Sequence, residues 1–150
     1  MEHYDSDKAA RVWQRVRGEA PMPAEIPGLP ALIAAEAELQ GLYRSMAKQF
    51  PAAAELARDC GRHAAMLRGI CDCVGSPRID GGPRQIDGGP PRNGLRLCYS
   101  KTLQAIGEYE KLAMHPEYGC AMAAMAQKKR EHACKLLERM GATPPRPAAR

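Results

Sequence analysis

The chain has 150 residues and a mass of 16.3 kDa, the size of one domain with one hydrophobic core. Hydrophobic residues make up 45% of it and aromatic residues only 5%, so alanine, leucine and methionine must fill the core, which favours packed helices over sheets. The formal charge of +5 lies partly in the C-terminal tail and in a proline-rich loop. Such a scattered surplus is typical of a solvated surface and argues against nucleic-acid binding.

The N-terminal residues are charged and lack the apolar segment of a signal peptide. The longest apolar stretch, residues 29–35, is too short to cross a bilayer. We therefore expect a cytoplasmic protein that makes no membrane contact and keeps its six cysteines reduced. Cys60, Cys98 and Cys134 fall at or beside core positions of predicted helices, where cysteine packs as a small hydrophobic residue.

Residues 1–29 form a predicted N-terminal region with a short helix over 7–16 and a proline-rich linker. Val12, Trp13 and Val16 give this helix a small apolar face. A helix this short is not stable in isolation, so we expect it to dock on the rest of the chain.

Residues 30–141 are predicted to form four long helices. Apolar residues recur at three- and four-residue spacing, and Pro51, Pro77, Pro116 and Gly141 end or separate the periodic segments. The expected helices span residues 30–49, 51–73, 94–113 and 117–140. The tail, 142–150, is expected to be disordered.

Residues 75–93, between the second and third long helices, are rich in glycine and proline and contain a duplicated Ile-Asp-Gly-Gly-Pro. The repeat gives only a weak indication of calcium or phosphate binding, because further acidic ligands are missing; a flexible crossover is favoured. About 20 extended residues reach about 60 Å, whereas a 20-residue helix is about 30 Å long. The loop can therefore return along the whole bundle and leave the two helices it joins parallel.

Polar residues interrupt the apolar stripe of each long helix: Glu36 on the first, His63 on the second, Thr102 on the third, and Lys129 and His132 on the fourth. The helices also repeat in pairs. Leu39-Gln40 and Tyr43-x-x-Met46-Ala47 in the first resemble Leu103-Gln104 and Tyr109-x-x-Leu112-Ala113 in the third. The fold class is therefore all-α, with two similar helical hairpins joined by a long crossover into a four-helix bundle.

With these inward polar residues and paired helices, the chain resembles the ferritin-like superfamily, and within it the rubrerythrin-like bundles of anaerobic bacteria. That resemblance covers about Leu29 to Gly141 and implies two irons held by a Glu from each of helices one and three and a Glu-x-x-His from each of helices two and four. Here Glu36 and both histidines match the pattern. Thr102, Cys60 and Lys129 stand where the other three glutamates belong.

One carboxylate cannot neutralise two irons, and Lys129 places a cation at a ligand position. One hypothesis is a buried polar network in which the Lys129 ammonium pairs with Glu36 in place of the metal. Asp59 and Glu131 flank the histidines and are expected to face away from the core. A second hypothesis is a single zinc or ferrous ion held by Glu36, Cys60, His63 and His132.

These residues are compatible with three functions. The first is a metal-free structural or interaction module that associates as a homodimer or with a related bundle; this is the function we favour, with no cofactor. The second is an iron-dependent oxidoreductase acting on peroxide or oxygen, as the resemblance implies, and no rubredoxin-type cysteine pair follows to deliver electrons. The third is a binder of one iron or zinc. No catalytic residue is assigned.

Overall fold

A computed structural model describes residues 6–18, 26–76 and 82–141. These residues form five helices and no strand: α1 (Ser6–Val16), α2 (Leu29–Met46), α3 (Ala53–Val74), α4 (Gly94–Leu112) and α5 (Gly119–Arg139). The predicted all-α class is confirmed, and each expected helix is present within three residues of its predicted ends. The predicted disordered tail and parts of the linker and the duplicated loop lie outside the described residues. None of the described helices is both long enough and apolar enough to cross a membrane.

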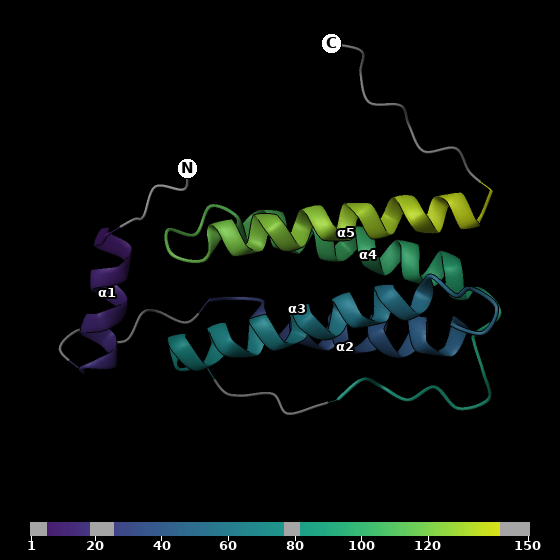
Figure 1. Cartoon of the computed structure of the whole chain (residues 1–150), viewed down its shortest axis with the longest axis horizontal. Coiled ribbons are helices and arrows are strands. Elements are labelled where there is room, and N and C mark those ends of the chain that lie inside the picture. Colours follow the sequence, from purple (N-terminus) through teal and green to yellow (C-terminus); the bar gives the residue numbers. More distant parts are fainter. Residues whose placement is uncertain (1–5, 19–25, 77–81, 142–150) are drawn as a thin grey trace, which may run out of the picture.

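The four long helices form two antiparallel hairpins that pack against each other (Figure 1). The helix pairs α2–α3 and α4–α5 make the closest contacts, and α2 packs on α4 between the hairpins. Residues 82–93 run along the bundle toward the start of α4, and α3 and α4 run in the same direction, as predicted (Figure 1). Gly75, with a φ of 71°, ends α3 in the left-handed conformation that glycine adopts most readily.

The crossover packs on α2 at a glycine. The Arg84 amide donates a hydrogen bond to the Ala37 carbonyl oxygen at 3.3 Å. A Cβ atom placed on Gly41 would lie 1.9 Å from the Arg84 carbonyl oxygen, a distance that no side chain tolerates. The returning chain therefore approaches α2 closely because residue 41 has no side chain.

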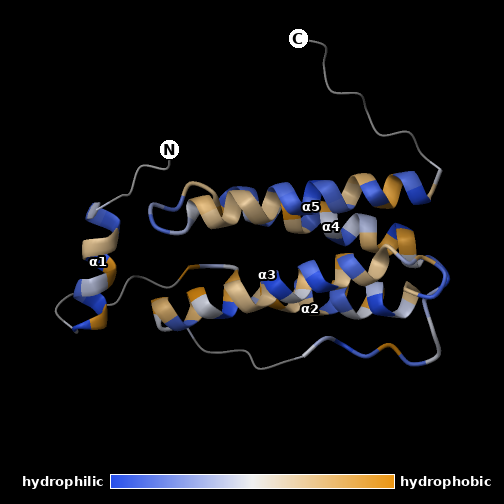
Figure 2. Ribbon diagram, in the orientation of Figure 1, coloured by the Kyte–Doolittle hydropathy of each residue, from blue (hydrophilic) through white to orange (hydrophobic). Residues whose placement is uncertain are grey.

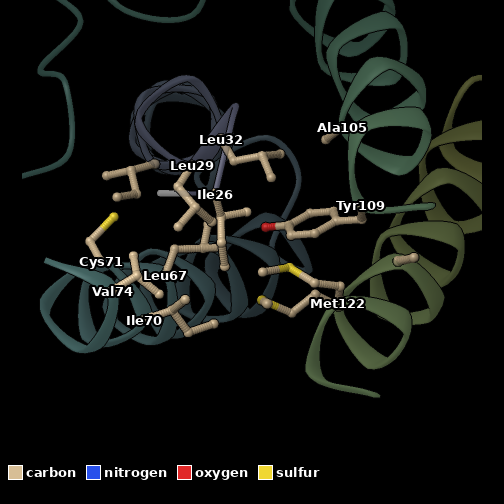
Figure 3. Close-up of a cluster of buried hydrophobic side chains, with 13 residues drawn as sticks. Ile26, Leu29, Leu32, Leu67, Ile70, Cys71, Val74, Ala105, Tyr109 and Met122 are labelled. Carbon is tan, nitrogen blue, oxygen red and sulfur yellow. The ribbon is translucent and has the colours of Figure 1, made fainter. Parts of the chain in front are cut away.

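Two apolar clusters fill the interior, one toward each end of the long helices. Hydrophobic and hydrophilic residues alternate along each helix, as expected for faces that pack inward and outward (Figure 2). The first cluster contains Leu29, Leu67, Tyr109 and Met122, and Figure 3 shows Tyr109 reaching from α4 toward the α2–α3 hairpin. The second cluster contains Leu39, Tyr43, Leu56, Cys98 and Leu136.

Helix α1 lies across one end of the long helices (Figure 1), and its apolar face is not buried. Val12, Trp13 and Val16 are 44%, 62% and 70% exposed. The Arg15 guanidinium instead donates to the Glu117 carboxylate in the turn between α4 and α5, with Nη1 2.9 Å from Oε1. The helix therefore contacts the rest of the chain through this charged pair, while its apolar face lies in solvent.

The expected cysteine positions are confirmed for Cys60 and Cys98, which are fully buried. Cys134 is exposed, so its predicted core position is wrong. The apolar stripe of α5 runs through Ala133 and Leu136, and Cys134, directly after Ala133, faces outward. The described cysteines are all free thiols.

Candidate functional site

A layer of polar side chains crosses the interior where the two apolar clusters meet. On each long helix an inward polar residue lies between the residues of the first cluster and those of the second, and Asp59 lies beside Cys60 of the second cluster. Every residue in this layer is at most 6% exposed: Glu36, Asp59, His63, Thr102, Lys129 and His132. Buried polar groups destabilise a fold unless they find partners, so this layer is the candidate functional site.

Lys129 and Glu36 form a buried ion pair at the centre of the layer. The Lys129 Nζ lies 2.7 Å from Glu36 Oε2, and both side chains are fully buried. Burial raises the pKa of Glu36, but contacts with His63 and Lys129 outweigh it and leave that pKa below its ordinary value. Burial lowers the pKa of Lys129, but the contacts with Glu36 and Cys60 together outweigh burial and leave that pKa above its ordinary value. Both groups are therefore ionised, as the hypothesis of an ammonium in place of a metal requires.

Cys60 is the second partner of the ammonium. The Lys129 Nζ donates a hydrogen bond to Cys60 Sγ at 3.1 Å. Burial raises the pKa of the Cys60 thiol to about 12, although the Lys129 charge opposes this. The thiol is therefore protonated at neutral pH, whereas a metal ligand or nucleophile must be a thiolate.

Asp59 faces the core and pairs with His132, which corrects the expectation that it faces away. Its Oδ2 lies 2.9 Å from His132 Nε2, and Arg62 reaches its Oδ1 from the surface at 3.2 Å. Burial, with help from the Lys129 charge, lowers the pKa of His132 to about 4, so the ring is neutral and Nε2 donates to the carboxylate. The signal was present in the sequence, since Asp59 follows Leu56 by three residues and precedes His63 by four. Glu131 is exposed as expected.

Two tyrosines connect the hairpins in matching ways. The Tyr109 hydroxyl donates to Glu36 Oε1 at 2.8 Å, and the Tyr43 hydroxyl lies 3.4 Å from Thr102 Oγ1. Each tyrosine also contacts the histidine of the other hairpin edge to face, at 6.1 Å for Tyr43 and His132 and at 6.2 Å for His63 and Tyr109. The two histidine rings stack 6.4 Å apart. The sequence repeat thus becomes an approximate twofold arrangement around the polar layer.

The layer approaches the surface between α3 and α5. A cavity of about 280 Å³ there is lined by Asp59, His63, Arg62, Met66, Ala124, Met125 and Lys128. The Nδ1 atoms of His63 and His132 are buried without a hydrogen-bond partner, and His63 Nδ1 lies 3.5 Å from Glu36 Oε1. Glu36 Oε2 is also buried without a hydrogen bond, and the Lys129 ammonium 2.7 Å away supplies its counter-charge.

The predicted metal ligands Glu36, Cys60, His63 and His132 all reach this layer, but their arrangement does not fit a bound metal. The ammonium of Lys129 contacts Glu36 and Cys60, the thiol is protonated, and His132 is engaged by Asp59. A cation in contact with two of the four donors opposes a metal ion electrostatically. In the described part of the chain, no group of three or more His, Cys, Asp and Glu side chains is arranged to hold a metal ion.

No protein-family model, no curated protein and no solved structure matches this chain. Its function must therefore be argued from its own residues.

Proposed function

We propose that this chain is a ferritin-like bundle without a metal centre, and that it serves as an association module. The observation that carries the proposal is the buried contact of the Lys129 ammonium with Glu36 and Cys60. A metal-binding bundle brings carboxylates together and neutralises them with cations from solution. Here the chain supplies the positive charge itself, so the polar layer needs no ion.

The ferritin-like part of the proposal is supported by the approximate twofold arrangement. Tyr43 and Tyr109 occupy matching positions on α2 and α4, and each contacts the residue seven positions before its counterpart: Thr102 and Glu36. Two hairpins joined by a long crossover, with polar side chains projecting inward at one level, are the architecture of ferritin-like carboxylate proteins. The three substituted carboxylate positions, Cys60, Thr102 and Lys129, all remain in the buried layer.

The association is proposed to use α1 and to involve a second copy of the chain. Val12, Trp13 and Val16 form an apolar face on an 11-residue helix in which no residue is buried. Helices of this length gain most of their stability from packing, and exposed tryptophans are frequent anchors of protein interfaces. Two such helices from two copies can bury their faces against each other, since a twofold dimer uses the same patch twice.

The association is tested by light scattering during size-exclusion chromatography of the whole chain. We expect a concentration-dependent dimer for the wild type and a monomer for Trp13→Ala. Leu103→Ala is the matched control, because Leu103 is 46% exposed on α4, away from α1. A wild-type monomer at all concentrations, or a dimer that survives Trp13→Ala, would contradict the proposed association.

The alternative function is that of a binder of one iron or zinc, with peroxide- or oxygen-linked redox activity for iron. One observation favours it: the His63 and His132 Nδ1 atoms are buried and have no hydrogen-bond partner. Lys129 would have to leave Glu36 and Cys60 before those residues could bind a metal. Zinc or ferrous iron added to the purified protein would then raise the midpoint of thermal unfolding. We expect no such rise.

A further inference from the structure

A second cavity lies at the opposite end of the long helices from α1. It has a volume of about 670 Å³, within the range of small-molecule sites. The turn after α2, the chain before α4, the first turn of α4 and the end of α5 surround it. Its apolar lining consists of Met46, Phe50, Pro90, Pro91, Leu95 and Met140. None of these residues belongs to the polar layer, so this cavity is independent of the proposed function.

The charged lining of this cavity is entirely positive. Arg92, Arg96 and Arg139 contribute guanidinium groups, and no aspartate or glutamate lines the cavity. Arg139 is held in place, because Nη2 donates to the Gln49 carbonyl oxygen at 2.7 Å and the guanidinium lies 5.5 Å from the centre of the Phe50 ring. Arg92 and Arg96 form no ion pair within the described part of the chain. The three guanidinium groups therefore lie beside the apolar lining residues with no carboxylate in the cavity lining.

Arg96 adds a positive charge at the N-terminus of a helix. It lies in the first turn of α4, a helix with no acidic residue in that turn. Positive side chains are unfavourable near a helix N-terminus, where the backbone dipoles already place positive charge. A bound anion would relieve this repulsion and accept hydrogen bonds from the guanidiniums.

We propose that the cavity binds a small amphiphile that carries a carboxylate or phosphate head on an apolar chain. The head contacts Arg92 and Arg96 at the rim. The chain packs along Pro91, Leu95 and Met140, which are apolar and only partly buried, and so removes their remaining apolar area from water.

Isothermal titration calorimetry of the full chain tests this proposal, with dodecanoate and dodecyl phosphate as probes below their micelle concentrations. We expect both to bind, and inorganic phosphate and neutral dodecanol to bind at least about tenfold more weakly, since each lacks half of the recognition. The double variant Arg92→Gln/Arg96→Gln should weaken binding by about tenfold or more. Both side chains are exposed, so this variant should unfold at the wild-type midpoint.

Arg130→Gln is the matched control, because it removes an exposed arginine of α5 that does not line the cavity. Its affinity for dodecanoate should equal that of the wild type. Equal binding of dodecanol and dodecanoate, equal binding of inorganic phosphate and dodecyl phosphate, or unchanged affinity in the double variant would each overturn the proposal. So would failure of both amphiphiles to bind, or binding only to vesicles of phosphatidylglycerol and not to the monomeric probes.

Discussion

The hydroxyl of Tyr109 donates to Glu36 at 2.8 Å, whereas Tyr43, its counterpart on α2, lies 3.4 Å from Thr102. The difference follows from one substitution. Glu36 is an ionised acceptor, and Thr102 is a neutral hydroxyl at the matching position of α4. Hydrogen bonds to charged groups are shorter and stronger than those between neutral groups.

Removing the two tyrosine hydroxyls should therefore have unequal effects. Tyr109→Phe leaves a buried carboxylate with one donor fewer, and we expect a loss of about 2 kcal/mol in the free energy of unfolding. Tyr43→Phe should lose about 0.5 kcal/mol, because its hydrogen bond is long and neutral. Urea denaturation of the two variants checks this, and equal losses would refute the asymmetry.

Lys129→Met should destabilise the fold by about 3–5 kcal/mol, because it leaves Glu36 buried without its counter-charge. Lys128→Met is the matched control, since Lys128 is 43% exposed and pairs with Glu131 at the surface; we expect a change within about 0.5 kcal/mol. Chemical denaturation measures both.

The double variant Glu36→Gln/Lys129→Met separates the charge from the packing. It removes both charged groups, so it should recover part of the free energy of unfolding that Lys129→Met loses. A double variant less stable than Lys129→Met would mean that the unpaired carboxylate is not the source of that loss.

Stability should fall as the pH is lowered from about 6.5 to about 4. The pKa of His132 is about 4 in the folded chain and has an ordinary value of 6.5. In this window the unfolded chain binds a proton that the folded chain does not, so His132 contributes a slope of up to about 1.4 kcal/mol per pH unit. Below that window Asp59 and Glu36, whose pKa values are lowered, add to the loss of stability.

NMR titration of the imidazole resonances checks the assignment of this slope to His132. The ring should remain neutral from pH 7 down to about 5, with Nε2 protonated and hydrogen-bonded to Asp59. A His132 ring that titrates near 6.5 would show that burial and the Lys129 charge do not lower its pKa.

Two glycine substitutions should have opposite effects. Gly41→Ala forces the Arg84 carbonyl away from α2, so we expect a loss of about 1–3 kcal/mol. Gly69→Ala, on an exposed position of α3 with nothing within 4 Å of the added carbon, should gain about 0.5–1 kcal/mol from helix propensity. The midpoints of thermal unfolding of the two variants, each compared with the wild type, measure both effects. Stabilisation by Gly41→Ala would place the crossover away from α2.

The sequence predicted the helices and much of the polar layer because both follow from helical periodicity. Glu36, His63, Thr102, Lys129 and His132 were assigned to the interior by their spacing, and all are buried. The pairing of Lys129 with Glu36 followed from charge alone, since a buried carboxylate needs a cation.

The remaining features depend on tertiary contacts that periodicity does not contain. Helical spacing to Leu56 and His63 indicates an inward Asp59, but its partner, His132 of α5, is a tertiary contact that this spacing does not reveal. The exposure of Trp13 could not be predicted either, because it depends on tertiary contacts of α1 such as the ion pair of Arg15 with Glu117, 102 residues away. The arginine-lined cavity is formed by three segments that are distant in the sequence, residues 46–50, 90–96 and 139–140.

The most direct test of the central claim is the metal content of the untagged protein, purified from cells supplied with iron and zinc and measured by elemental analysis. If the Lys129 ammonium replaces the metal charge, the protein should contain neither iron nor zinc in stoichiometric amount, and a chelator should leave its unfolding midpoint unchanged. Stoichiometric iron or zinc, together with a lower midpoint after chelation, would contradict the account and return Glu36, Cys60, His63 and His132 to the role of metal ligands.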